Sequence, residues 1–297
     1  MNILVIGHSV VDKIIDKSSI SIKPGGIFYS VVAFLSQVQK EDKLYLCSGI
    51  DEKNEGLFKD VYDQVEKDFI FKIDSIPQVE LIVDIDGERK EIYSLVPKNL
   101  TLPIDNLNRF DGILVNMISG NDISFTQLKH LKRNYTGLIY FDVHTLSRGA
   151  DKNLNRIFRR IEDFSKWAEC IDILQTNESE ILTLSDKTDE IQIIEELFSF
   201  GINQIIITRA ERGAAVFFRE NVLIKNYHKE ALQVNLINKV GCGDVFGAVY
   251  FYNYIKNKNV ILALEQANLF AGISTTYSEV KDYQNLKKDA NEQIGKK

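Results

Sequence analysis

The sequence has few cysteines, no excess of basic residues and no long apolar run, and each absence narrows what the protein can be. Its 297 residues include three cysteines, an odd number without a close pair, which disfavours a disulfide scaffold and favours a reducing compartment. A net charge of -6 disfavours general nucleic-acid binding. No apolar run reaches membrane-spanning length, and the first residues lack the pattern of a signal peptide. We therefore expect a cytoplasmic protein.

Several well-known motifs are also absent. The sequence contains no H-E-x-x-H or C-x-x-C, which disfavours a structural zinc site. It contains neither G-x-x-x-x-G-K-[ST] nor G-x-G-x-x-G, so a P-loop and a Rossmann dinucleotide site are poorly supported. With 44% apolar and 26% charged residues and no visible repeat, the chain has an ordinary globular composition. We expect a single domain, 1–297, with a small appendage.

The most informative stretch is residues 238–254, where two glycines and a carboxylate precede a pattern of apolar residues close to helical spacing. Gly241 and Gly243 let the backbone turn sharply and approach a ligand closely. The first amides of a helix have no partner within the helix and favour an anion. The stretch therefore suits an anion hole with Asp244 beside it. The alternative is an ordinary helix start in which Asp244 interacts with the helix dipole.

Gly-Cys-Gly-Asp at 241–244, followed by this helix, resembles the G-A-G-D signature of the ribokinase-like (PfkB) carbohydrate kinases. The resemblance implies that Asp244 is the catalytic base and that the amides of Gly241, Cys242 and Gly243 form an anion hole for the transferred phosphate. Cys242 occupies the family's usual alanine position, and we interpret it as a small apolar filler rather than a nucleophile. The family's fold is an α/β class, three-layer α/β/α sandwich with a mostly parallel central sheet and a small β lid. Its members use ATP and Mg²⁺.

A second group of residues near the N-terminus matches the family's sugar site. Residues 3–6 form an apolar run that predicts a buried parallel strand, and Asp12 follows it at the sheet edge where α/β proteins bind ligands. In the family an aspartate here binds sugar hydroxyls. A G-G pair before a helix, with an asparagine four residues later, is the other sugar signature. The resemblance thus implies four acceptor-binding residues: Asp12, Gly25, Gly26 and Ser30, the last in place of the asparagine.

From residue 112 the pattern alternates between strands and helices. We expect strands over 112–115, 137–141, 171–174 and 204–208, and helices over 124–133 and 153–168. The strand ends bring four polar residues to one edge of the sheet: Asn116, Asp142, His144 and Asn177. His144 is a candidate substrate contact, although a lone loop histidine is more often a plain polar residue.

Asn177 and Glu180 form a motif with two interpretations. Asn177 at a helix start with Glu180 three residues later is a capping-box pattern. In the resembling family, N-x-x-E organises magnesium and its waters near the phosphates. A capping residue can also present a carboxylate to a ligand, so both interpretations can hold.

The nucleotide side of the resemblance is less complete. The family usually has T-x-G-x-x-G at the phosphates, and here Thr208 and Gly213 match while Ala210 replaces the first glycine. The helix expected over 261–277 is rich in small residues, and a matching helix borders the adenine in the family. This implies nucleotide contacts from Asn268 and Ala271, whereas close helix packing is the structural alternative.

Two hairpins predict the lid. Residues 79–85 and 91–96 alternate in polarity around Asp86-Gly87, which is a good β-hairpin signal. With an early hairpin it would give a lid from about 12–24 and 78–97. In the family such a lid covers the sugar site and often forms a homodimer. From Asp282 onward the chain is polar and we expect it to fray.

The acceptor is the least determined part of the hypothesis. The phosphosugar branch tends to place a lysine directly after G-G, and Ile27 stands there, which favours an unphosphorylated sugar or polyol. The compact region from Asp12 to Gly26 also resembles the inositol-kinase branch. Phe28 and Tyr29 permit a nucleoside kinase with a stacked base as an alternative. The departures at Ser30, Ala210 and Asn238 leave open a non-catalytic relative that binds a sugar or nucleotide.

Overall fold

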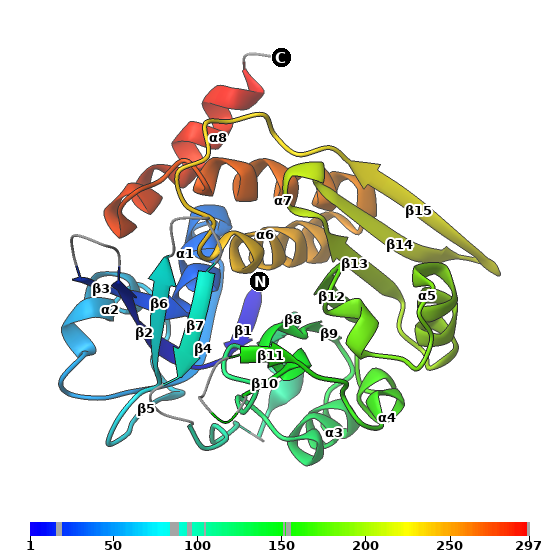
Figure 1. The fold of residues 1–297 in the computed structure, drawn as a ribbon, viewed down its shortest axis with the longest axis horizontal. Helices are drawn as coiled ribbons and strands as arrows, with labels where there is room; N and C mark the ends of the chain where they lie inside the picture. Colours follow the sequence, from blue (N-terminus) through cyan, green and yellow to red (C-terminus); the bar gives the residue numbers. More distant parts are fainter. Residues whose placement is uncertain are drawn as a thin grey trace.

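A computed structural model of the chain describes residues 1–15, 20–83, 89–93, 97–103, 105–150, 152 and 156–295. Within these residues nine strands form the central sheet: β1 (Asn2–Ile6), β4 (Lys43–Ile50), β5 (Ile70–Lys72), β8 (Gly112–Asn116), β9 (Leu138–Asp142), β12 (Ile173–Asn177), β13 (Gln204–Thr208), β14 (Ala214–Glu220) and β15 (Leu223–Lys229). Their spatial order is β15-β14-β13-β12-β9-β8-β1-β4-β5 (Figure 1). From β13 to β5 all neighbours are parallel, and β14 and β15 extend the sheet in antiparallel pairing.

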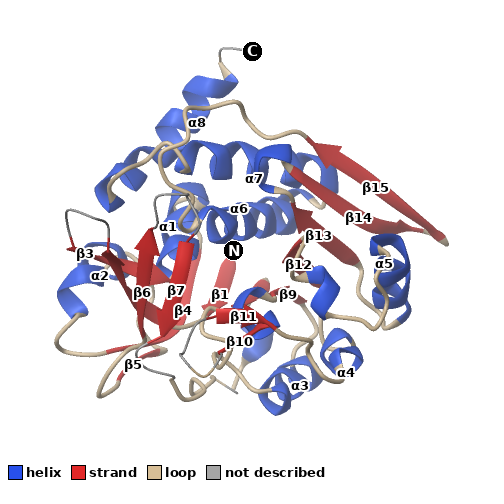
Figure 2. Cartoon of the chain, viewed as in Figure 1, coloured by secondary structure: helices blue, strands red, loops and turns tan. Residues whose placement is uncertain are grey.

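Helices cover both faces of this sheet (Figure 2). In β1, Ile3 and Val5 face one hydrophobic core while Leu4 and Ile6 face the other, which explains the continuous apolar run. The first core is covered by α1 (Phe28–Gln37), α2 (Glu55–Tyr62), α6 (Cys242–Asn257), α7 (Val260–Ser274) and α8 (Leu286–Ile294). The second is covered by α3 (Phe125–Asn134), α4 (Phe164–Ala168) and α5 (Glu190–Ser199). The predicted three-layer α/β/α sandwich is confirmed.

A second sheet stands beside the main one, in the order β3-β2-β6-β7. It consists of β2 (Ser9–Ile15), β3 (Ile20–Gly26), β6 (Gln78–Val83) and β7 (Arg89–Tyr93). β6 and β7 pair antiparallel as the hairpin signal predicts, while the predicted turn at Asp86-Gly87 lies outside the described residues. We call these four strands the lid. Asp12, Gly25 and Gly26 belong to its strands rather than to loops, because β2 and β3 pair from Ser9 opposite Gly26 onward.

The helix predicted over 153–168 is wrong in its first part. Residues 153–155 lie outside the description, and the next three form β11 (Arg156–Phe158), antiparallel to β10 (Arg148–Ala150). Only α4 is helical. Ile157 and Phe158 are each 49% exposed, so they do not form the buried face that a helix would need here. Backbone pairing with β10 determines the conformation instead.

The predicted fraying after Asp282 is also wrong. A 3₁₀ segment, η5 (Val280–Asn285), leads into α8, and Tyr283, Leu286 and Ala290 are buried in the first core. Their spacing of three and four residues gives this polar segment one apolar stripe. The Tyr283 hydroxyl donates to the carbonyl oxygen of Val240 at 3.4 Å, so the C-terminal segment supports the glycine loop from behind.

Four further 3₁₀ turns connect the elements: η1 (Leu107–Arg109), η2 (His144–Ser147), η3 (Ile181–Thr183) and η4 (Ala210–Arg212). Among the described helices, none combines the length and hydropathy needed to cross a bilayer.

Candidate active site

A cavity of about 700 Å³ opens at the carboxyl edge of the parallel strands, between the lid and the first turn of α6. Most residues predicted for the site line it: Asp12, Gly26, His144, Asn177, Glu180, Thr208, Gly213, Gly241, Cys242, Gly243, Asp244, Asn268 and Ala271. These positions span more than 250 residues of sequence. The sheet brings them together because parallel strands end at the same edge.

The glycine loop has a backbone shape that only glycine adopts easily. Gly241 is the N-cap of α6, with φ of +76° in the left-handed region. A Cβ on Gly241 would lie 2.2 Å from the Tyr29 ring, so the loop also packs too closely for a side chain. The loop therefore presents the first backbone N–H groups of a 16-residue helix to the cavity.

Asp244 lies in the first turn of α6 and is 7% exposed. Its Oδ1 accepts a hydrogen bond of 2.6 Å from Nδ2 of Asn116, at the end of β8. Burial, assisted by the charge of Asp12, raises the pKa of Asp244 to about 7, although the hydrogen bond from Asn116 acts in the opposite direction. A carboxyl group with this pKa can exchange a proton near neutral pH.

Two buried amides are further functional candidates: Asn116, which the sequence analysis placed at the sheet edge without a role, and Gln175, which it did not single out. Gln175 Nε2 donates to Asp142 Oδ2 at 2.8 Å and to the carbonyl oxygen of Gly243 at 3.0 Å, which ties β12 to the start of α6. Asn116, at the end of β8, is 1% exposed, and Gln175, in the middle of β12, is 3% exposed. A polar residue that interrupts or ends such a strand must have a buried partner, and that was the available signal.

On the acceptor side, Asp12 lies on β2 and is 6% exposed. A Cβ on Gly25 would come within 2.3 Å of its carboxylate, so Gly25 leaves the space that Asp12 occupies. Gly25 and Ser30 are not among the described residues that line the cavity. Ser30 is 1% exposed because α1 turns Tyr29 toward the cavity and the next residue into the core.

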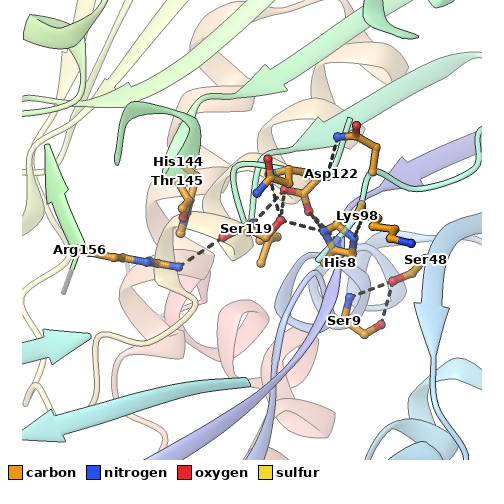
Figure 3. Close-up of polar contacts among 12 residues, drawn as sticks. His8, Ser9, Ser48, Lys98, Ser119, Asp122, His144, Thr145 and Arg156 are labelled. Carbon is orange, nitrogen blue, oxygen red and sulfur yellow. Dashed lines mark hydrogen bonds and ion pairs between the residues drawn. The ribbon is translucent and has the colours of Figure 1, made fainter. Parts of the chain in front are cut away.

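A buried network fixes the start of the lid strand that carries Asp12 (Figure 3). His8 Nε2 donates to the carbonyl oxygen of Lys98 at 3.1 Å, and Nδ1 lies 3.0 Å from Asp122 Oδ1. The backbone N of Ser119 donates to the other oxygen of Asp122 at 2.8 Å. The network thus joins the entry of β2 to the loop after β8 and to the segment that follows the lid.

Asn177 and Glu180 form the reciprocal contacts of the predicted capping box. Asn177 Oδ1 accepts from the backbone N of Ser179 and of Glu180, each at 2.9 Å, and Glu180 Oε2 accepts from the backbone N of Asn177 at 2.9 Å. The predicted helix after them is only the 3₁₀ turn η3. The box therefore orients Glu180 rather than starting a long helix.

The carboxylate of Glu180 lines the cavity and could hold a magnesium ion through water. Glu180 is 5% exposed, and burial raises its pKa to about 7 even though Arg148, 3.6 Å away, acts in the opposite direction. Burial, together with the charges of Glu180 and Asp244, also raises the pKa of Asp142 well above its ordinary value. Within the described part of the chain, no group of three or more His, Cys, Asp or Glu side chains could hold a metal ion alone. Magnesium here would keep most of its waters, as it commonly does.

The other end of the cavity is suited to a nucleotide. Thr208 and Gly213 flank η4, and Gly213 has φ of +88° with Lys229 O 1.9 Å from where a Cβ would lie. Asn268 and Ala271 lie on α7, and Asn268 Nδ2 donates to the carbonyl oxygen of Glu230 at 2.7 Å.

The two arginines of the 208–213 loop are bound to carboxylates. Arg209 contacts Glu178 at 2.6 Å and Glu190 at 2.5 Å, and Arg212 also pairs with Glu178. These pairs shape the loop from outside and neutralise the arginine charges locally.

His144 and Cys242 complete the set of predicted residues. His144 lines the cavity with φ of +33°, and its Nδ1 lies 2.7 Å from Thr145 Oγ1. Burial raises the pKa of Cys242 to about 11. A thiol with this pKa is protonated at neutral pH and is a poor nucleophile.

Comparisons with known proteins agree with this geometry. Residues 144–285 match the pfkB family carbohydrate kinase model. Over 119 residues the chain is 32% identical to deoxyribokinases from Salmonella typhi and Salmonella typhimurium, a match that covers 38% of this chain and 37% of each relative.

Solved structures resemble the whole fold. A ribokinase from Thermotoga maritima has a TM-score of 0.73 at 17% identity and covers 98% of this chain and 99% of its own. An Arabidopsis thaliana ribokinase complexed with ribose and ATP has a TM-score of 0.71 at 16% identity, with 97% and 98% covered. A pyrophosphate-dependent kinase in the ribokinase family, complexed with a pyrophosphate analog and myo-inositol, has a TM-score of 0.75 at 17% identity, with 93% and 95% covered. Residues 144–285 thus resemble the pfkB family carbohydrate kinases in sequence, and the chain as a whole shares the fold of the ribokinase-family structures.

Proposed function

We propose that the protein is an ATP-dependent kinase that transfers the γ-phosphoryl group to a hydroxyl of a small sugar or polyol. The observation that carries the proposal is the position of Asp244. Its buried carboxylate lies at the cavity end of α6, beside the glycine loop, and is held by Asn116. Asp12 lines the acceptor side of the same cavity and Glu180 the donor side.

In the proposed reaction, Asp244 accepts the proton of the attacking hydroxyl as the new O–P bond forms and the bond from the γ-phosphorus to the bridging oxygen breaks. ADP leaves with the electrons of that bond. The transition state of phosphoryl transfer is loose, so positioning and charge stabilisation contribute most of the rate. The N–H groups of Gly241, Cys242 and Gly243 stabilise the charge on the transferred group.

Glu180, oriented by Asn177, would hold magnesium through water, and the ion would supply positive charge to the phosphate oxygens. Asp12 binds hydroxyls of the acceptor. Gly213 and Thr208 contact the donor phosphates, and Asn268 and Ala271 border the adenine. The observation supporting this order is the lining of one continuous cavity from β2 to α7.

The nucleoside-kinase alternative has less support. Phe28 is 1% exposed and packs against Phe58 and Tyr62 in the core, with ring centroids 6.0 and 6.5 Å away. It cannot stack on a base without leaving the core. Tyr29 does line the cavity, but it lies over Gly241.

The proposal is tested by a panel of donors and acceptors, with product detection by mass spectrometry. ATP and pyrophosphate are compared as donors with magnesium, against sugars, polyols, sugar acids, sugar phosphates and nucleosides. We expect an acceptor heavier by one phosphoryl group when ATP is the donor. A nucleoside product would favour the alternative. ATP binding without any product across the panel would favour a binding protein.

The pH dependence of kcat/KM should reflect the ionisation of Asp244. Because the base must be ionised and its pKa is raised to about 7, we expect kcat/KM to rise with pH through this value and then level off. Asn116→Leu removes the hydrogen bond that favours the ionised carboxylate, so the acid limb should move upward by about one pH unit. An acid limb at the same pH in both proteins would contradict this role of Asn116.

We also propose that the lid forms a homodimer. β3 is an edge strand of the lid sheet, and Ile20 and Ile22 on one of its faces are 64% and 58% exposed. The double variant Ile20→Lys, Ile22→Lys should reduce the mass measured by light scattering from dimer to monomer. A monomeric wild type would contradict the proposal.

A further inference from the structure

The hairpin β10–β11 brings two arginines into the cavity. Its register pairs residue 148 with 158 and residue 150 with 156, so the side chains of Arg148, Arg156 and Phe158 share one face of the hairpin. Arg148, Arg156 and Phe158 all line the cavity. The Arg148 guanidinium lies 4.9 Å from the centre of the Phe158 ring, which restricts its orientation. The hairpin therefore places two guanidinium groups in the wall of the cavity.

This part of the wall is on the acceptor side. Arg156, labelled in Figure 3, donates from Nη2 to the carbonyl oxygen of Ile118 at 3.4 Å. Ile118 is two residues beyond Asn116, the partner of Asp244. β11 also packs against β7 of the lid. The donor contacts proposed above, on η4 and α7, belong to other elements of the cavity wall.

The lid wall of the same space offers little to an ionic ligand. Val10, Val79 and Leu81 of the lid line the cavity with apolar side chains, and Asp12 is the acidic group among them. An uncharged polyol needs hydroxyl-binding groups such as Asp12, but it does not need two guanidinium groups. A guanidinium carries five N–H donors in a planar fork, so it can contact a carbonyl oxygen and a carboxylate or phosphate at once.

Resting on the proposed kinase function, we propose that Arg156, with Arg148 beside it, binds an anionic group of the acceptor. The acceptor is then a polyhydroxylated acid or a sugar phosphate, phosphorylated on a hydroxyl directed at Asp244. This revises the expectation of an uncharged acceptor, which rested on the absence of a lysine at Ile27. The two arginines lie on the hairpin β10–β11, part of which was predicted from the sequence to be helical.

Arg148 and Arg156 have different roles in the proposed binding of the acceptor. The charges of both arginines act on Glu180, and that of Arg148, which lies 3.6 Å away, acts more strongly than that of Arg156. Arg156 reaches the loop after β8 and is the specificity-determining residue. Substituting Arg156 therefore separates acceptor recognition from donor binding better than substituting Arg148.

The test compares acceptors of one carbon skeleton: a polyol, its aldonic acid and its terminal phosphate, with magnesium-ATP. For the wild type we expect one of the two anionic acceptors to have the highest kcat/KM, and which of them it is identifies the anion. Arg156→Gln should lower that value by about 10- to 100-fold. It should leave the KM for ATP and the kcat/KM for the polyol within about threefold. Arg156→Lys keeps the charge and should retain part of the preference.

Arg160→Gln is the matched control, because Arg160 is 49% exposed, pairs with Asp186 and does not line the cavity. Thermal unfolding of all variants checks that they fold. Titration calorimetry of the acid without donor gives a second readout, in which Arg156→Gln should weaken binding. A polyol preferred by the wild type, or a rise in the KM for ATP in Arg156→Gln with every acceptor, would overturn the inference while the kinase function stands. No turnover with any acceptor would instead contradict the kinase proposal itself.

Discussion

Asp244→Asn should lose at least about a thousandfold in turnover while it binds ATP as the wild type does. The amide has nearly the shape of the carboxylate and can still accept the hydrogen bond from Asn116 Nδ2, so the first turn of α6 should keep its geometry. It cannot accept the proton of the attacking hydroxyl. Steady-state kinetics and ATP titration separate the two effects. Near-wild-type turnover would contradict the assignment of Asp244 as the base.

The same variant should be more stable than the wild type at alkaline pH. The folded-state pKa of Asp244 is raised from 3.8 to about 7, so its ionised form is disfavoured by folding. Its stabilising contribution is therefore complete below the unfolded pKa and is lost as pH rises through about 7. Asn does not titrate, and we expect Asp244→Asn to melt at a higher temperature than the wild type at pH 8, with the difference shrinking toward pH 5. Equal melting temperatures at pH 8 would argue that the carboxylate is well solvated.

Gly241→Ala should lower turnover by at least about a hundredfold, because displacement of the anion hole affects transition-state binding directly. Two independent constraints act on this residue. Its φ of +76° is unfavourable for alanine, and the new Cβ would lie 2.2 Å from the Tyr29 ring. Tyr29 is itself packed against Tyr283 with ring centroids 5.5 Å apart, so it cannot easily move aside. Kinetics and thermal unfolding measured together give the loss of activity at a known stability.

Gly56→Ala is the matched control for this substitution. Gly56 is in α2, far from the cavity lining, and a Cβ there meets nothing within 4 Å. Alanine in a helix is favoured over glycine by roughly 0.5–1 kcal/mol, so the control should be as active as the wild type and slightly more stable. If Gly241→Ala retained the activity of Gly56→Ala, the loop would not act as an anion hole.

The parallel sheet was predictable because its strands are buried on both faces. The runs at 3–6 and 204–208 have no polar interruption, and the structure has strands there as expected. The position of the cavity was also predictable, because residues that follow the carboxyl ends of parallel strands lie at the same edge of the sheet. Asp12, Glu180 and Asp244 were assigned from the resemblance of their motifs to the family, and all three line the cavity.

The errors have physical causes that a single sequence does not reveal. Backbone pairing with β10 makes residues 156–158 a strand, and that pairing is not visible in the side-chain pattern of the segment itself. Ser30 was assigned by analogy, but the rotation of α1 presents Tyr29 instead. Asn116 and Gln175 depend on tertiary partners, Asp244 and Asp142, that only the folded sheet brings within hydrogen-bonding distance.

The central claim is phosphoryl transfer dependent on Asp244, and the most direct measurement is acceptor-dependent ADP release from magnesium-ATP at pH 8, with wild type and Asp244→Asn measured side by side. We predict release by the wild type that requires an acceptor and is lost in the variant, while both proteins bind ATP equally. Equal release by the two proteins would contradict the account. So would the absence of release from a wild type that binds ATP in the presence of every class of acceptor.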